Sequence, residues 1–153
     1  MSQDLESMAT SIFNNQVPAM WTNDGEGKGH LSLKPLASWI QDVNARIDFL
    51  QGWYDNGTPD VFWVSGFFFP QAFFTGTQQN FARKHTIAVD QISFAHVVLR
   101  ITHTDVKARP EAGCYVYGLY LEGCRWDADA AMLADSDPKK LFVDMPMLHF
   151  VPV

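Results

Sequence analysis

The sequence predicts an α+β fold in which helices come first and strands follow. Two stretches, about 35–54 and 70–85, have the features of helices: the first repeats apolar residues every three or four positions, and both begin at a proline. After residue 86 the pattern changes, and about 91–153 is rich in β-branched and aromatic residues separated by turn residues. These observations predict a helical half followed by a strand-rich half.

The first thirty residues hold two short segments and a glycine-rich loop. Residues 1–10 are polar and lack apolar periodicity, so we expect a frayed lead-in, whereas 11–21 predicts a short helix or turn. Residues 22–30 (TNDGEGKGH) are predicted to form a loop. This loop does not match the phosphate-binding template, in which Gly-Lys is followed by Ser or Thr.

The first long helix is predicted from an apolar stripe. Ser32 is a candidate cap, Pro35 suits the first turn, and the run 55–57 (DNG) ends the helix. The stripe consists of Leu36, Trp39, Ile40, Val43, Ile47, Leu50 and Tyr54.

The central stretch 61–83 carries an unusual density of aromatic residues. Residues 61–64 predict a short buried strand, and Pro70 begins the second helix. Because each buried aromatic ring removes about 150–250 Å² from water, other elements or a partner must cover this stretch. Its aromatic residues are Phe62, Trp63, Phe67, Phe68, Phe69, Phe73, Phe74 and Phe81.

Three strands are predicted in the second half, over 91–102, 114–122 and 145–153. Alternation along the second of them places Tyr115 and Leu119 on one face. We expect Leu148 and Phe150 of the last strand to be buried against that face.

Charge and composition exclude some classes of protein. The net charge of −6 over 153 residues argues against nucleic acid or an anionic membrane as a partner. No apolar run has the length of a membrane span, and the start lacks the pattern of a signal peptide. The densest basic run, 83–85, falls in the last turn of the second helix, where cations complement the helix dipole.

No catalytic or metal centre is predicted. The five histidines lack the spacing of a metal site. If 114–124 were one extended strand, Cys114 and Cys124 would be too far apart for a disulfide. A bend at Gly118 or Gly123 would change that separation, but buried thiols are the favoured role. Two cysteines outside a secretory context indicate a reducing compartment. The carboxylates lie in polar turns, and neither a nucleophile elbow nor a dinucleotide motif occurs.

Six ordered blocks resemble the C-terminal domain of dynein heavy chains. The block FWVSGFFFPQAF at 62–73 is more similar to the axonemal branch, of cilia and flagella, than to the cytoplasmic branch. The blocks are 14–21, 32–50, 62–85, 88–94, 115–127 and 133–147.

The resemblance implies a helical part over 12–86 and an incomplete antiparallel β-barrel over 87–153, together forming one domain. It implies a non-catalytic module that packs on the AAA+ motor ring of the same heavy chain and modulates minus-end-directed movement on microtubules. ATP and Mg²⁺ would belong to the parent motor, so no cofactor is expected in this fragment. Intermediate, light intermediate and light chains, and microtubules, would be partners of the parent complex. The location implied is cytoplasmic, in the cytoskeleton of the axoneme of cilia or flagella.

The candidate core or ring-docking residues that follow from this resemblance are Phe62, Trp63, Phe67, Phe68, Phe69, Phe73, Phe74 and Trp126. Three departures from the family accompany them: a local insertion at 23–30, Ala95-His96 in place of alternating acidic and aromatic residues, and an end at Val153. We expect that end to fall before the family's last strands and to leave an unpaired sheet edge.

Two other functions are compatible with parts of the sequence. The first is a stand-alone β-rich module that binds a small ligand through Trp63, Trp126 and Tyr120. The second is a small hydrolase, which the missing pair of nucleophile and base disfavours.

Overall fold

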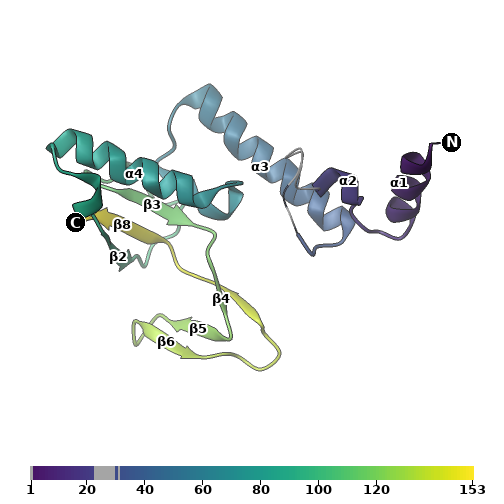
Figure 1. The fold of residues 1–153 in the computed structure, drawn as a ribbon. Helices are drawn as coiled ribbons and strands as arrows, with labels where there is room; N and C mark the ends of the chain where they lie inside the picture. The colour runs from purple at the N-terminus through teal and green to yellow at the C-terminus, as the bar shows by residue number, and fades with distance from the viewer. Residues whose placement is uncertain (1, 23–29, 31) are drawn as a thin grey trace. The chain divides into compact units, whose positions relative to one another are not determined.

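The computed structural model describes residues 2–22, 30 and 32–153. The predicted glycine-rich loop 22–30 lies outside the described residues except at its two ends. The chain divides into two compact units, Met1–Asp55 and Asn56–Val153, and each is described on its own (Figure 1).

The first unit is helical, and it begins earlier than predicted. The expectation of a frayed lead-in was wrong, because helix α1 spans Gln3–Phe13. Ser2 caps this helix by accepting a hydrogen bond from the backbone N–H of Asp4, and Asp4 and Glu6 lie in its first turn. Both features stabilise a helix N-terminus, and both can be read in the sequence.

Two further helices complete this unit. The short helix α2 spans Ala19–Thr22 and the long helix α3 spans Leu36–Asn56, which confirms the predicted helix at 35–54. Trp39 is the one residue of α3 that is buried, and its ring stacks on Trp21 of α2 at 5.8 Å between centroids. Most of the predicted apolar stripe is exposed, including Ile47 and Tyr54.

The second unit is a mixed sheet with one helix on its face (Figure 1). The four-stranded sheet has the order β1–β3–β8–β2, formed by Val61–Trp63, Cys114–Tyr117, Leu148–Pro152 and Phe94–Val98. β1 pairs with β3 in parallel, whereas β3 with β8 and β8 with β2 are antiparallel. The sheet does not close into a barrel, which agrees with the expectation of an incomplete barrel. The region is rich in sheet and contains both parallel and antiparallel strand pairs.

Helix α4 spans Pro70–His85, as predicted, with Pro70 at its first position. It ends at Thr86, which has a left-handed backbone with φ of 56°. Two 3-10 helices, η1 (Val64–Gly66) and η2 (Val89–Gln91), flank it in the sequence. The predicted strand at 91–102 was therefore too long, because η2 occupies its start and β2 is only five residues long.

Two small antiparallel sheets complete the unit. β4 (Tyr120–Glu122) pairs with β7 (Phe142–Asp144), and β5 (Cys124–Asp127) pairs with β6 (Met132–Asp135). The predicted strand at 114–122 is interrupted at Gly118, where a φ of 81° breaks the alternation. Tyr115 and Leu119 therefore do not share one continuous strand face.

The core lies between α4 and one face of the four-stranded sheet. Leu148 lies opposite Val116, and Phe150 lies opposite Cys114. Because opposite residues in a pair share a face, the expected packing of Leu148 and Phe150 against Tyr115 was wrong. Tyr115 lies opposite His149 on the other face of the sheet.

Candidate functional site

The phenylalanines of α4 form the centre of the core in the second unit. The Phe73 ring lies 4.7 Å from that of Phe62 and 4.8 Å from that of Phe67. The Phe74 ring lies 4.7 Å from that of Phe150 and 5.9 Å from that of Phe94. Four of the eight candidate core or docking residues, namely Phe62, Phe67, Phe73 and Phe74, thus belong to this internal cluster.

Phe68 and Phe69 differ from the four clustered phenylalanines. They connect η1 to α4, and their exposed fractions are 59% and 65%. Two adjacent exposed phenylalanines are an apolar surface of the kind that protein interfaces use. Within the aromatic stretch, these two residues are therefore the candidates for docking.

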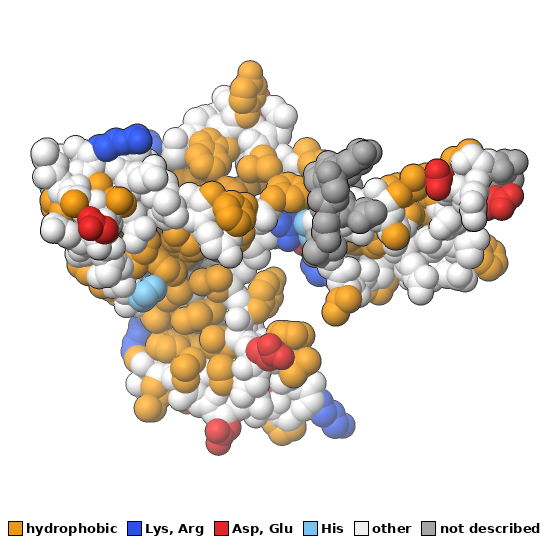
Figure 2. Space-filling view, viewed as in Figure 1, with side chains coloured by type: hydrophobic (Ala, Val, Ile, Leu, Met, Phe, Trp, Pro, Cys, Tyr) orange, Lys and Arg blue, Asp and Glu red, His pale blue; other side chains and the backbone are white. Residues whose placement is uncertain are grey.

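Trp63 and Trp126, the remaining two candidates, line a pocket of about 610 Å³. The loop 99–103, Tyr117 and Tyr120 also line this pocket. Figure 2 shows hydrophobic side chains gathered on the visible face of this unit between α4 and the hairpin of β5 and β6. The structure thus separates the eight predicted residues into a core cluster, an exposed pair and a pocket pair.

Gly118 allows the Trp63 ring to lie against the backbone. A Cβ atom at position 118 would lie 2.4 Å from Cδ1 of Trp63, which is too close for any real contact. At the neighbouring position in the pocket, the ring of Tyr117 stacks on that of His103 with 4.1 Å between centroids. Local backbone geometry and stacking therefore position two of the aromatic rings in this pocket.

Charged residues also line the pocket. Asp144 lies on β7 opposite Tyr120 of β4, and Asp129 lies in the turn between β5 and β6. Arg100 lies in the loop that follows β2. None of the ion pairs found among the described residues involves these three side chains.

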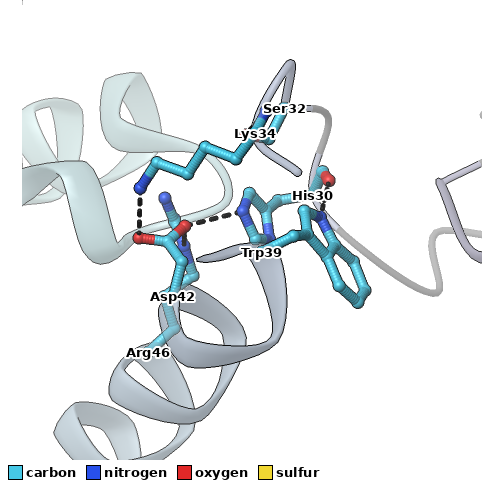
Figure 3. A network of polar contacts seen from close by, with 6 residues as sticks. All are labelled: His30, Ser32, Lys34, Trp39, Asp42 and Arg46. Atoms are coloured by element: carbon cyan, nitrogen blue, oxygen red, sulfur yellow. Dashed lines mark hydrogen bonds and ion pairs between the residues drawn. The ribbon is translucent and has the colours of Figure 1, made fainter. Parts of the chain in front are cut away.

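The first unit contains a network of polar contacts centred on Asp42 (Figure 3). His30 Nε2 lies 2.7 Å and Arg46 Nε 3.0 Å from Asp42 Oδ2, and Lys34 Nζ lies 3.1 Å from Oδ1. The indole N–H of Trp39 donates to the carbonyl oxygen of His30 at 3.1 Å, and the two rings stack at 5.4 Å. The network therefore ties His30 and Lys34 to helix α3.

Burial and neighbouring charges shift two pKa values in this network. Burial raises the pKa of Asp42, but hydrogen bonds from Lys34 and Arg46 outweigh that effect and hold it below 3.8. Burial and the nearby Arg46 lower the pKa of His30 below 6.5, although Asp42 opposes them. The spacing of Asp42 and Arg46, four residues apart on a helix, was a signal for this pair in the sequence.

Among the described residues, neither the cysteine thiols nor the possible metal ligands form a catalytic arrangement. Burial raises the pKa of the Cys114 thiol to about 11, so the thiolate that a nucleophile requires is scarce at neutral pH. Both cysteines are free thiols. In the described part of the chain, no group of three His, Cys, Asp or Glu side chains has the arrangement of a metal site.

None of the helices in the described part of the protein is both long enough and apolar enough to cross a membrane. Fold and site together define an α+β domain: an aromatic helix lies on a mixed sheet, with two exposed phenylalanines and an aromatic pocket.

The protein belongs to the family of C-terminal domains of dynein heavy chains, whose model matches residues 1–153. It is 52% identical to rat dynein axonemal heavy chain 1 over 153 residues, covering 100% of this sequence and 3% of the relative. It is 51% identical to the human heavy chain 1 and 45% identical to mouse dynein axonemal heavy chain 12, each over 152 residues and 99% of this sequence. These matches cover 4% and 5% of the two relatives.

The comparisons confirm the resemblance drawn from the sequence blocks, including its axonemal branch. The relatives are named as axonemal heavy chains, which indicates localisation in the axoneme of cilia or flagella. The 153 residues span only about 3–5% of the length of the relatives they match.

Sequence reasoning did not identify most of the pocket. It singled out Trp63, Trp126 and Tyr120 as a possible ligand site, and the structure brings these three residues to one pocket. It missed His103, Asp129 and Asp144, which lie in loops or a short strand. The glycine at 118, inside an aromatic strand pattern, was the available signal that the backbone bends there.

Proposed function

We propose that this protein is a non-catalytic structural and regulatory domain that packs on the AAA+ motor ring of an axonemal dynein heavy chain. In this role it modulates ATP-driven, minus-end-directed movement on microtubules. The match to the family over the whole sequence carries the proposal. The exposed pair Phe68 and Phe69 supports it, because that pair offers an apolar surface next to the aromatic core of the unit.

We propose that different phenylalanines of the aromatic stretch anchor the helix and contact the motor ring. Phe73 and Phe74 anchor α4 on the sheet, so that the residues just before the helix are held in place. Phe68 and Phe69 would then contact the ring as pre-positioned side chains, which lowers the entropy lost on docking. Intermediate, light intermediate and light chains, together with microtubules, would be partners of the whole complex.

We propose that this domain neither binds nor hydrolyses ATP. ATP and Mg²⁺ would act in the ring of the parent motor, and the domain would act through contact alone. We expect the purified 153-residue protein to show neither ATP turnover nor saturable nucleotide binding, and saturable binding would contradict this part of the proposal.

A variant of the parent heavy chain tests the regulatory role. We expect the double substitution Phe68→Glu and Phe69→Glu to change microtubule gliding velocity and ATPase rate, because charges at the contact would loosen the domain. Phe142→Glu is the matched control, since Phe142 is 60% exposed but lies on β7. Unchanged gliding and ATPase in the double variant, or equal effects in the control, would contradict the proposal.

The pocket keeps a second role open for part of the unit. Trp63, Trp126 and Tyr120 line it together, as a small-ligand module requires. The match of the whole sequence to the dynein family makes a stand-alone module the weaker proposal for the protein as a whole. A ligand site and a packing role are nevertheless compatible, because the pocket residues and the Phe68–Phe69 pair are different.

A further inference from the structure

The pocket beside Trp63 combines aromatic walls with charges that have no ionic partner among the described residues. The side chains of Trp63, Tyr117, Tyr120 and Trp126 line it. One face of the Tyr117 ring is covered by His103, so the other three rings carry most of the aromatic wall. We infer that this pocket binds an arginine side chain presented by a basic segment of a partner protein.

The aromatic rings favour a cation that is weakly hydrated and flat. The faces of Trp and Tyr attract cations, and Trp attracts them most strongly. A guanidinium is planar, stacks on aromatic faces and is less hydrated than an ammonium. An arginine side chain would therefore use these walls better than a lysine side chain.

Two carboxylates in the pocket favour a positively charged ligand. Asp129 and Asp144 both line it and both are exposed, so a ligand can reach them. The ion pairs seen in the described part of the protein leave both carboxylates unpaired. A carboxylate accepts two parallel hydrogen bonds from a guanidinium, which adds geometric selectivity to the attraction.

Arg100 and His103 are the residues in the pocket that oppose a cationic ligand. His103 is stacked on Tyr117, and Arg100 is exposed on the loop after β2. The two carboxylates therefore face one permanently charged cation, and the protein as a whole has a net charge of −6. Removing the charge of Arg100 is expected to strengthen binding, which makes it a useful variant.

The size of the pocket fits a side chain that a peptide presents. At about 610 Å³ it lies within the range of about 300–1,000 Å³ that is usual for ligand sites. The pocket is larger than one guanidinium group, so the backbone on either side of the arginine in the partner's segment would enter the pocket as well. This inference is independent of the proposed docking of Phe68 and Phe69 on the AAA+ motor ring, because neither residue lines this pocket.

The test is an NMR titration of the 153-residue protein with three blocked tripeptides, Gly-Arg-Gly, Gly-Lys-Gly and Gly-norleucine-Gly. The reporters are the indole N–H signals of Trp63 and Trp126, assigned with single Trp→Phe variants. We expect the arginine peptide to shift both signals and to bind at least about fivefold more tightly than the norleucine peptide. The lysine peptide is expected to fall between the two.

Charge variants then locate the contact. Asp129→Asn and Asp144→Asn should each weaken binding of the arginine peptide by about threefold or more, and Arg100→Gln should strengthen it. Asp90→Asn is the matched control, because Asp90 is an exposed aspartate on η2 outside the pocket, and it should change nothing. The two pocket aspartates lie on different elements, so a folding defect in one variant leaves the other informative.

Three results would overturn the inference. Equal affinity for the norleucine and arginine peptides would show an apolar pocket without charge selection. Absence of shifts at Trp63 and Trp126 with every peptide at tens of millimolar would show that there is no site. An equal loss in Asp90→Asn and the pocket variants would show that only the net charge matters.

Discussion

The ring of Phe74 on helix α4 lies 4.7 Å from the ring of Phe150 on strand β8. Residues far apart in the sequence thus meet at the centre of the second unit. We expect Phe74→Ala to lower the free energy of unfolding by about 3 kcal/mol, since it removes this contact and leaves a cavity. Urea denaturation followed by circular dichroism measures the change.

Phe142→Ala is the control for that substitution, because Phe142 is 60% exposed on β7. This substitution is expected to lower the free energy of unfolding by no more than about 1 kcal/mol. Similar losses in both variants would show that the Phe74 contact does not hold α4 on the sheet.

The burial of Leu148 on β8 gives a second prediction. Leu148 is 4% exposed and lies opposite Val116, which is fully buried. Leu148→Asp is expected to destabilise the unit by about 3–5 kcal/mol, because it buries a charge without a partner. Leu119→Asp should be milder, since Leu119 lines the open pocket and an aspartate there can reach water. Urea denaturation measures both changes. Equal losses in the two variants would contradict the distinction between a buried position at Leu148 and an open one at Leu119.

Gly118 and Gly123 form a matched pair for a third prediction. Both have a positive φ, 81° and 66°, but only at Gly118 would a Cβ atom collide with Trp63. Each alanine substitution carries the backbone penalty of about 1 kcal/mol. Gly118→Ala should add a further loss and shift the tryptophan fluorescence, because the Trp63 ring must move. Equal stabilities, with unchanged fluorescence in both variants, would show that the ring contact is unimportant.

The Asp42 network predicts how stability depends on pH. Because the folded pKa of Asp42 is lowered, its contribution is present above the ordinary value of 3.8 and is lost as the pH falls through the folded pKa. The folded pKa of His30 is also lowered, so its contribution is complete above 6.5 and declines as the pH falls below that value. Thermal unfolding of the first unit should therefore shift to lower temperature on acidification below pH 6.5.

Asp42→Asn isolates this effect. We expect a loss of about 1–3 kcal/mol at pH 7, because Lys34 and Arg46 would lose their charged acceptor. Asp48→Asn, an exposed position on the same helix, is the control and should be near neutral. A melting temperature that does not differ between the two variants from pH 4 to 8 would contradict a stabilising role for the network.

The sequence was most informative where local patterns decide the structure. The proline at position 70 and the apolar period of 36–54 predicted α4 and α3 because helices depend on nearby residues. The parallel pairing of β1 with β3 joins segments that lie far apart in the sequence, and no local pattern encodes it. For the same reason, the eight aromatic candidates could be identified from the sequence, but which of them are buried and which are exposed could not.

The pocket shows the same limit. Its residues come from β1, the loop after β2, the bend at Gly118, the hairpin of β5 and β6, and β7. Trp63, Tyr120 and Trp126 were recognisable by type as candidate ligand contacts. Asp129 and Asp144 lie in polar turns or a short strand, and only folding brings them beside the aromatic rings.

The most direct test of ring packing is the affinity of the 153-residue protein for an axonemal dynein motor ring prepared without this domain. We expect saturable binding, weakened about tenfold or more by Phe68→Glu with Phe69→Glu and unchanged by Phe142→Glu. Absence of binding by the unaltered protein, or binding that tolerates both glutamates, would contradict the proposal that these two phenylalanines dock the domain on the ring.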